Sequence, residues 1–138
     1  MDTIRSRAQV LVTRGNKFVL IFRHKNGENY YSMPGGGIKV GETPLEAARR
    51  EIQEELGLKL KNLALFSEIK TESRHDFNFT AETDSETFVV VGPEKKQLDN
   101  PHNLFKPEWH DRDSMRTDIH LYPESARQML QYFLNSQS

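Results

Sequence analysis

A glycine-rich loop that leads directly into a short helix constrains this chain more than any other stretch of its sequence. Three successive glycines, Gly35–Gly37, give the backbone a freedom that residues with side chains lack. A helix is predicted to follow, because Thr43 is a good N-cap and Glu46 stands three residues later, as in a capping box. Gly57 supplies the left-handed residue that commonly ends a helix. The segment Gly36–Leu58 is therefore predicted to form one loop-and-helix unit.

Two stripes of this helix point to different environments. One stripe is apolar, with spacings of three and four residues, and is predicted to face a core. Its members are Leu45, Ala48, Ile52 and Leu56. The other stripe holds three carboxylates, Glu51, Glu54 and Glu55, at relative positions i, i+3 and i+4. Like charges at these spacings repel one another by about 0.2–0.5 kcal/mol per pair.

A solvated face, whose acids pair with basic side chains one turn further along the chain, is the simpler interpretation of this acidic stripe. It fits poorly, because only Glu55 has such a partner, Lys59, and Lys59 lies beyond the predicted end of the helix. A hard divalent cation would relieve the repulsion, since Mg²⁺ and Mn²⁺ prefer oxygen ligands. The stripe therefore indicates a metal site.

The loop and helix together resemble the Nudix box of the MutT-like hydrolases in every defining position. The matching residues are Gly36, Glu42, Arg50-Glu51-Ile52, Glu54-Glu55 and Gly57-Leu58. Nine specified positions within 23 residues make a chance match very improbable. The resemblance implies an α/β protein, with the Nudix α/β/α sandwich around a mixed β-sheet.

The resemblance also implies a reaction. Nudix enzymes are metal-dependent pyrophosphohydrolases that cleave a nucleoside diphosphate linked to another moiety by water attack on phosphorus. Mg²⁺ is the expected cofactor, with Mn²⁺ as a substitute. The alternative is a catalytically silent nucleotide-sensing domain on the same fold. The complete set of three helix acids favours the enzyme.

Roles for single residues follow from the same resemblance. The three helix acids map to the metal ligands, together with the backbone carbonyl of Gly35. Glu54 or Glu51 is the expected general base. An acid from a later loop is the rival, and the candidates are Glu94, Asp99 and Glu108. Structural roles inside the motif are expected for Gly36, Glu42, Arg50 and Gly57.

The rest of the chain predicts strands on both sides of this unit and a helix at its end. Apolar and alternating runs predict strands at Ile4–Thr13, Phe18–Phe22, Leu60–Glu72, Asp76–Glu82 and Glu86–Val91. Polar loops are predicted at Asn26–Asn29 and at Pro93–Pro107. The second is unusually long, so it either closes over a bound substrate or is a plain connection. A last short strand is predicted to begin at Glu108, and Pro123 to open a helix whose apolar face comprises Ala126, Met129, Leu130 and Phe133.

Two arginines near strand ends are candidates for substrate binding. Arg7 and Arg23 lie on the glycine side of the chain, where they could contact phosphate, although solvated arginines are more common. The segment Ser73–Asp76 has neither the proline nor the tyrosine that marks some Nudix subfamilies. This argues weakly against specialists for ADP-ribose or dinucleoside polyphosphates. A nucleoside triphosphate or a related small nucleotide is the expected substrate.

Composition sets the outer limits. The 138 residues suffice for one domain, 1–138, and are too few for two. A net charge of −1 gives no basic footprint for a nucleic-acid polymer. The absence of cysteine excludes disulfides, thiolate metal sites and a thiol nucleophile. The sequence has neither a signal peptide nor an apolar run of membrane-spanning length, so we expect a cytoplasmic protein with no membrane partner. A homodimer is left open.

Overall fold

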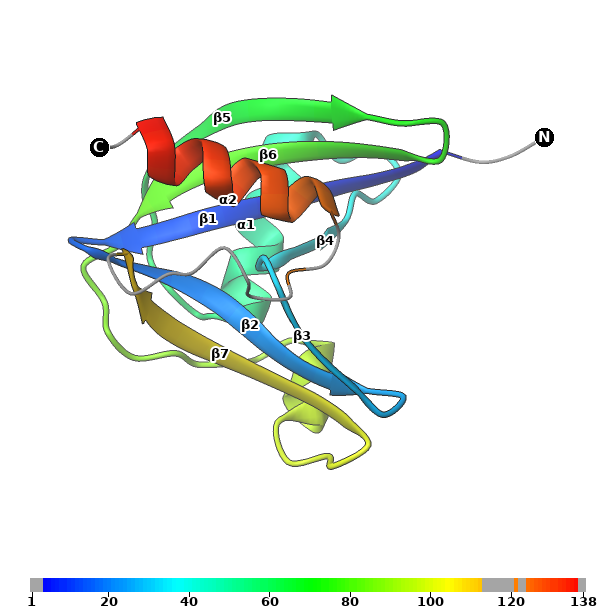
Figure 1. The fold of residues 1–138 in the computed structure, drawn as a ribbon, viewed down its shortest axis with the longest axis vertical. Coiled ribbons are helices and arrows are strands. Elements are labelled where there is room, and N and C mark those ends of the chain that lie inside the picture. The colour runs from blue at the N-terminus through cyan, green and yellow to red at the C-terminus, as the bar shows by residue number, and fades with distance from the viewer. Residues whose placement is uncertain (1–3, 113–120, 122–123, 137–138) are drawn as a thin grey trace.

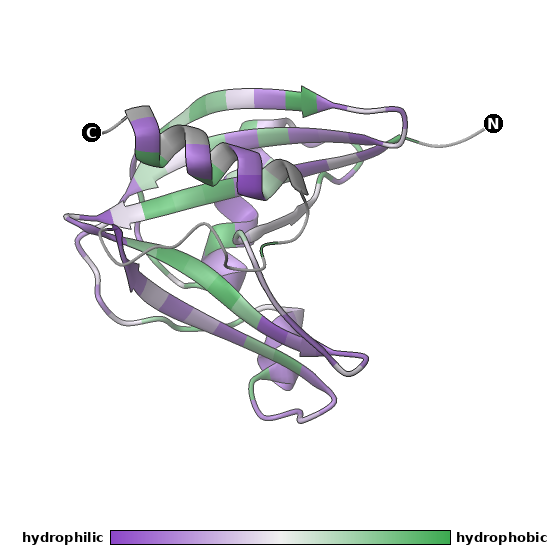
Figure 2. Ribbon diagram, in the orientation of Figure 1, coloured by the Kyte–Doolittle hydropathy of each residue, from purple (hydrophilic) through white to green (hydrophobic). Residues whose placement is uncertain are grey.

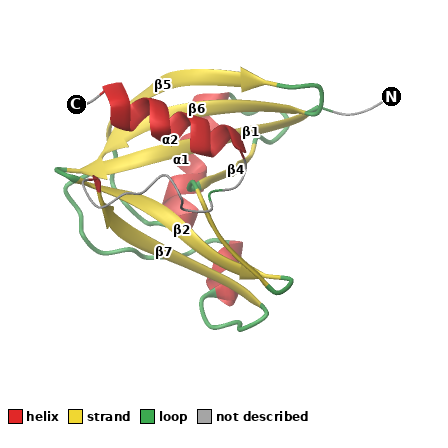
Figure 3. Ribbon diagram, viewed as in Figure 1, coloured by secondary structure: helices red, strands yellow, loops and turns green. Residues whose placement is uncertain are grey.

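The fold is a mixed β-sheet with one helix on each face (Figures 1 and 3). The computed structural model describes residues 4–112, 121 and 124–136. Its elements, in chain order, are β1 (Arg5–Arg14), β2 (Lys17–Lys25), β3 (Glu28–Ser32), β4 (Gly35–Gly37), α1 (Pro44–Glu55), β5 (Lys61–Lys70), β6 (Arg74–Glu82), the 3₁₀-helix η1 (Pro93–Gln97), β7 (Asn103–Asp111) and α2 (Glu124–Ser136). No helix in these described ranges is long and apolar enough to cross a membrane.

The strands are ordered β3-β2-β1-β6-β5, with β4 also paired to β1 and β7 also paired to β2. The neighbours β1 and β6 run parallel, and the other paired strands run antiparallel. A parallel pair needs a long connection, and the connection from β1 to β6 contains α1. The predicted mixed sheet is confirmed.

Successive residues of the central strands point to opposite faces of the sheet, and each face is covered by one helix. Val10 of β1 is fully buried in the same cluster as Ile52 of α1. Leu11, the next residue, is fully buried with Leu130 of α2. Figure 2 shows the apolar residues along the middle of β1 and β2, between the two helices. The expected α/β/α sandwich is therefore confirmed.

The helix α1 begins and ends as the sequence predicts. The Thr43 hydroxyl accepts a hydrogen bond from the Glu46 amide (3.1 Å), and the Glu46 carboxylate accepts one from the Thr43 amide (2.9 Å). Gly57 has a φ of 62°, as a left-handed helix stop requires. The apolar stripe is wrong at Leu45, which is 40% exposed. Ala47 is buried in its place.

The predicted strand at Glu86–Val91 is wrong, because this segment pairs with no strand of the described chain. Its backbone instead serves the end of α1. The amides of Val89 and Val91 donate to the carbonyls of Leu56 and Glu54, at 2.8 Å each. The last carbonyls of a helix lack partners within the helix. The amides of this segment supply those partners instead of pairing with a neighbouring strand.

The predicted long loop at Pro93–Pro107 is also wrong in extent. It begins with η1 and ends inside β7, which pairs with β2 along its whole length. The last strand therefore starts at Asn103 rather than at Glu108. Proline removes a hydrogen-bond donor, and Pro107 is tolerated because β7 pairs with β2 alone among the described strands.

The predicted polar loop at Asn26–Asn29 is a tight turn. Asn26 and Gly27 have φ values of 54° and 77°, as in a two-residue hairpin, and β3 begins at Glu28. In α2, the predicted core residues Ala126 and Leu130 are buried. The predicted helix start at Pro123 and the side chains of Met129 and Phe133 lie outside the described residues.

Candidate functional site

The glycine strand β4 lies between β1 and α1, and two of its glycines have no space for a side chain. A Cβ atom on Gly35 would lie 2.2 Å from the Ala8 carbonyl oxygen, and one on Gly36 would lie 2.5 Å from Oε1 of Glu51. A Cβ atom on Gly37 would meet nothing within 4 Å. Gly35 therefore lets β4 pack closely against β1, and Gly36 lets the Glu51 carboxylate approach the backbone.

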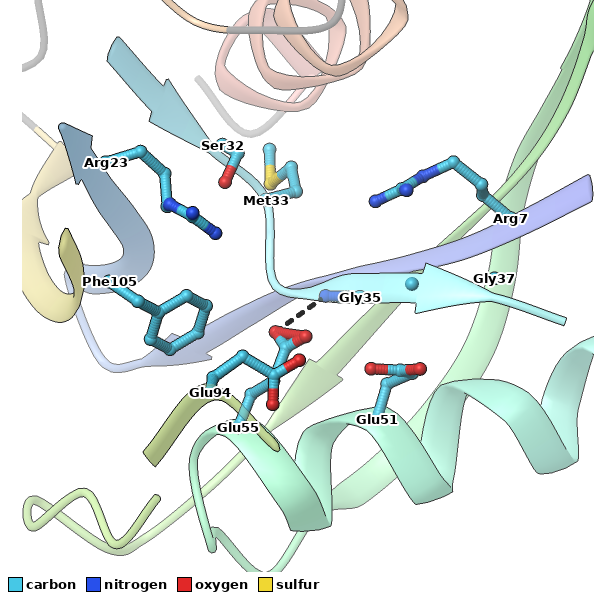
Figure 4. Close-up of a pocket in the computed structure, with 11 residues that line it drawn as sticks. Arg7, Arg23, Ser32, Met33, Gly35, Gly37, Glu51, Glu55, Glu94 and Phe105 are labelled. Carbon is cyan, nitrogen blue, oxygen red and sulfur yellow. Dashed lines mark hydrogen bonds between the residues drawn. The ribbon is translucent and has the colours of Figure 1, made fainter. Parts of the chain in front are cut away.

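Two acids of α1 lie buried under this strand (Figure 4). Glu51 is 7% exposed and Glu55 is 3% exposed. The Gly35 amide donates a hydrogen bond to Oε1 of Glu55 (3.0 Å). Burial, followed by the charge of Glu51, raises the pKa of Glu55 well above its ordinary value. The predicted crowding of carboxylates is real, and it is buried rather than solvated.

Glu94 of η1 completes a cluster with these two acids. Carboxylate oxygens of Glu51, Glu55 and Glu94 all lie within 4.8 Å of one another. One oxygen of Glu94, Oε2, is buried and has no hydrogen-bond partner among the described residues. Burial is also the main cause that raises the pKa of Glu94, with the charges of Glu51 and Glu54 adding to it.

The backbone around Gly92 places Glu94 in the cluster. The Gly92 amide donates to the carbonyl of Glu54 (2.9 Å), which ties the start of η1 to the end of α1. A Cβ atom on Gly92 would lie 2.6 Å from Cβ of Glu54, so only glycine fits this contact. Glu94 was one of the rival bases predicted from the sequence. Its position depends on contacts between segments far apart in the chain, which no local pattern reveals.

A cavity of about 290 Å³ opens above the three carboxylates. Both predicted substrate-binding residues, Arg7 and Arg23, line it from opposite sides (Figure 4). The Arg23 guanidinium donates to the side chain of Asn103 and lies 5.5 Å from the ring centroid of Phe105. The full lining comprises Arg7, Arg23, Ser32, Met33, Gly35, Gly36, Gly37, Glu51, Glu55, Glu94 and Phe105.

Three other predicted site residues lie outside this lining. Glu54 contacts Nη1 of Arg50 at 3.4 Å. Asp99 lies in the turn after η1, and Glu108 lies on β7, where it contacts His110 at 3.3 Å. The lining residues Ser32, Met33 and Phe105 were not singled out from the sequence. Ser32 lies in β3 and Met33 follows it, and no strand was predicted there. Phe105 lies in the part of β7 that was predicted to be loop.

Arg50 links the glycine loop to the helix. Its guanidinium donates to both oxygens of Glu42, at 2.7 and 3.0 Å, and to the carbonyl of Gly37 at 3.0 Å. It also donates to Oε1 of Glu51 at 2.8 Å. These contacts agree with the structural role that the resemblance implies for Glu42 and Arg50. A guanidinium that binds a carboxylate through two hydrogen bonds fixes its orientation as well as its distance.

We expect the ion pair between Arg50 and Glu42 to be lost in acid. The hydrogen bond from Arg50 is the main cause that lowers the pKa of Glu42 from 4.5 to about 2. Because the folded pKa lies below the unfolded one, the stabilisation is complete above about pH 4.5 and is lost as the pH falls toward 2. Glu42→Gln should therefore lower the melting temperature at pH 7, and the difference from wild type should vanish near pH 2. Melting curves across this range test it, with Glu46→Gln as the control. A difference that does not change with pH would contradict the assignment.

The donor set fits a hard divalent cation. Three carboxylates offer oxygen ligands, one of their oxygens is buried without a partner, and glycines hold the adjacent backbone close to them. Burying such charges without compensation is unfavourable, and a cation would compensate them. Exposed acidic groups are common without an ion, but Glu51 and Glu55 are buried.

Comparison with known proteins agrees with this geometry. A family model described as the NUDIX domain matches residues 3–133. An RNA pyrophosphohydrolase of Psychromonas ingrahamii is 36% identical over 74 residues, which cover 54% of this chain and 38% of that protein. An RNA pyrophosphohydrolase of Francisella tularensis subsp. tularensis is 26% identical over 150 aligned positions, covering 96% of both. The chain thus matches less than half of the first relative's length and nearly all of the second's.

Solved structures share the fold at low sequence identity. A structure from a study of MutT from Aliivibrio salmonicida and Vibrio cholerae aligns with a TM-score of 0.76 and 14% identity, covering 97% of this chain and 99% of that one. A NUDIX hydrolase from Nitrosomonas europaea aligns with a TM-score of 0.77 and 14% identity, covering 99% of this chain and 73% of that one. The family model spans almost the whole chain, including the glycine strand, α1 and Glu94. The chain belongs to the Nudix hydrolase superfamily.

Proposed function

We propose that this protein is a metal-dependent pyrophosphohydrolase. It cleaves a nucleoside diphosphate linked to another moiety, and a nucleoside triphosphate or related small nucleotide is the expected substrate. The observation that carries the proposal is the buried cluster of Glu51, Glu55 and Glu94 beneath the glycine strand. A purely structural acidic helix would not need three carboxylates brought together from two elements.

In the proposed reaction, Glu51, Glu55 and Glu94 would hold the cation, with the Gly35 carbonyl as a further ligand. Glu54, the other helix acid predicted as a ligand, lies outside the cavity lining and is given no metal contact in this proposal. A bound Mg²⁺ or Mn²⁺ would neutralise phosphate oxygens and lower the pKa of a bound water. Arg7 and Arg23 would donate hydrogen bonds to the phosphates from the two sides of the cavity. Each group thus acts on a charge that the substrate carries into the site.

The general base remains a prediction from the resemblance. Glu51 lines the cavity, whereas Glu54 lies outside it and contacts Arg50. A base must come within hydrogen-bond reach of the attacking water, and carboxylates are suited to this role when their pKa is raised by their surroundings. Glu94, the predicted rival from a later segment, lines the cavity, so it is kept beside Glu51 and Glu54 as a candidate.

A second candidate substrate is the 5′ end of an RNA that carries a pyrophosphate. The specific observation in its favour is that both curated relatives described above are named RNA pyrophosphohydrolases. The net charge of −1 gives no general affinity for a polymer, so such a substrate would be recognised at its end. Comparing turnover of a nucleoside triphosphate with that of a short 5′-triphosphorylated RNA separates the two candidates.

Hydrolysis is expected to depend entirely on a divalent cation. Purified protein should release phosphate products from nucleotides with Mg²⁺ or Mn²⁺, should stop in excess EDTA, and should recover when Mg²⁺ is restored. Ca²⁺ should raise the melting temperature through binding but support little turnover, because its looser coordination positions water poorly. Full turnover in excess chelator would refute the proposal. Nucleotide binding with no turnover under any metal would instead establish the silent sensor.

A further inference from the structure

A second cavity, of about 190 Å³, adjoins the one above the carboxylates. The two cavities share Arg7, Arg23, Ser32 and Met33 in their linings. The second cavity is also lined by Arg5 and Arg74, two arginines that the proposed reaction does not use. We call Arg5, Arg7, Arg23 and Arg74 the arginine pocket. No acidic side chain of the described residues lines this cavity.

The pairing of β1 with β6 brings the arginines together. In the parallel register, Arg5 is opposite Arg74, and two residues further along Arg7 is opposite Asp76. Side chains two residues apart on a strand share one face, so Arg5 and Arg7 project on the same side. Like charges directly opposite each other on neighbouring strands are unfavourable. The stability of the sheet therefore does not explain why Arg5 and Arg74 lie opposite each other.

Asp76 offsets only part of this charge. It is 1% exposed and accepts hydrogen bonds from Nη2 and Nε of Arg74, at 3.1 and 3.3 Å. Burial, and then the charge of Arg74, lowers the pKa of Arg7 from its ordinary value. In the second cavity the only carboxylate bonded to the pocket among the described residues is Asp76, while the charge of Glu55 acts on Arg7 from the neighbouring cavity. Arg5 and Arg74 lie on the side away from the three acids, so that side carries the positive charge.

Two of these arginines carry buried donors without acceptors. The Nε atoms of Arg7 and Arg23 have no hydrogen-bond partner among the described residues. A buried donor left unpaired is unfavourable, and an arginine in water would not leave one unpaired. Solvated strand charges therefore do not account for Arg7 and Arg23, whereas an anion with several acceptor oxygens would.

We propose that the arginine pocket binds a phosphate group of the substrate that is not part of the hydrolysed anhydride. The inference rests on the proposed function, and it narrows the substrate class to nucleotides with at least one further phosphate. Arg7 and Arg23 border both cavities, so they connect the anhydride above the acids with the additional phosphate beside Arg5 and Arg74. Substrates whose remaining moiety is a neutral sugar leave Arg5 and Arg74 without a ligand.

The test compares three nucleotides in Mg²⁺ and measures kcat/KM for each. ADP-ribose has no phosphate beyond its diphosphate, ATP has one in the same chain, and 3′-phosphoadenosine 5′-diphosphate has one on the ribose. Wild type should prefer at least one of the last two over ADP-ribose by about tenfold or more, which is the effect of a charge-assisted hydrogen bond. The preferred compound identifies where the additional phosphate is attached.

Arg5→Gln is the decisive variant, because Arg5 is exposed and its loss should not disturb folding. It should lower the preference for the substrate with the additional phosphate about tenfold, by raising KM for that substrate. Turnover of ADP-ribose should be unchanged. Arg74→Lys keeps a cation beside Asp76 and should lower the preference less. Arg14→Gln on the same strand, where Arg14 pairs with exposed Glu86 at 2.8 Å, is the matched control. If Arg5→Gln lowers kcat/KM equally for all three substrates, or for none of them, the proposal is overturned.

A second measurement separates this inference from the proposed function. Titration calorimetry with inorganic tripolyphosphate in EDTA reports on the arginine pocket without any metal or turnover. Wild type and Arg14→Gln should bind it alike, and Arg5→Gln should bind it about tenfold more weakly. Binding that depends on Arg5 without hydrolysis of any nucleotide would refute the proposed function and retain the pocket. Hydrolysis of a nucleotide, together with tripolyphosphate binding that Arg5→Gln does not weaken, would refute the pocket and retain the proposed function.

Discussion

Glu51→Gln is expected to lower kcat by at least ~10² and to weaken Mg²⁺ binding, because it removes a buried charge from the proposed metal ligands. The substitution preserves volume, and its amide oxygen can still accept the hydrogen bond that Arg50 donates to Oε1 of Glu51. The loss should therefore reflect charge rather than unfolding. Steady-state kinetics across a range of Mg²⁺ concentrations, combined with melting curves in EDTA, distinguishes the two causes.

The control for this experiment is Glu46→Gln on the same helix. Glu46 is exposed, and glutamine preserves the capping box with Thr43, so kcat should stay within a factor of about two. Glu54→Gln tests the predicted base, and kcat should fall while Mg²⁺ affinity changes little. If Glu51→Gln turned over within a factor of a few of wild type, the cluster would have no catalytic role.

Gly35→Ala is expected to lower the melting temperature by roughly 6–24 °C, whereas Gly37→Ala should change it little. Gly35 has a φ of 149°, and its added Cβ atom would lie 2.2 Å from the Ala8 carbonyl oxygen. Backbone strain and overpacking each cost about 1–3 kcal/mol, and each kcal/mol shifts the melting temperature of a domain this size by about 3–4 °C. Thermal melts of both variants in EDTA measure the difference without any metal contribution.

The comparison within one glycine run makes this test specific. Gly37 has open space where its Cβ atom would lie, so alanine there should fit. Equal losses in the two variants would mean that the run matters for its flexibility alone. Equal stability in both would mean that β4 moves away from β1 at little cost, contrary to the close packing seen here.

Local signals in the sequence predicted the part of the site that lies on one helix. The capping box, the glycine stop and the acidic spacing all act within a few residues, so they fix α1 and the faces of Glu51 and Glu55. The same is true of the central strands, whose continuous apolar runs reflect burial on both faces. The sequence also indicated that Arg7 and Arg23 lie near strand ends, but it did not indicate that both would line one cavity.

Contacts between distant segments determined what the sequence did not reveal. The apolar run at Glu86–Val91 resembles a strand, but the unsatisfied carbonyls at the end of α1 compete for its amides. That competition also positions Glu94. Likewise, the opposition of Arg5 and Arg74 exists only in the parallel register of β1 and β6. A pattern of alternating arginines along one strand was the available signal, and it does not specify the neighbouring strand.

The parallel pairing of β1 with β6 has a consequence for how the protein folds. Two antiparallel strands can meet across a short turn, but β1 meets β6 only after the whole intervening segment has been brought together. Contacts of such sequence separation form slowly, whereas the hydrogen bonds within α1 join residues about four positions apart in the chain. During folding, Glu51 and Glu55 can therefore share a helix before Glu94 and the four arginines arrive. We therefore expect the folding chain to bring the proposed cation ligands together in two stages and to complete the two cavities in the second.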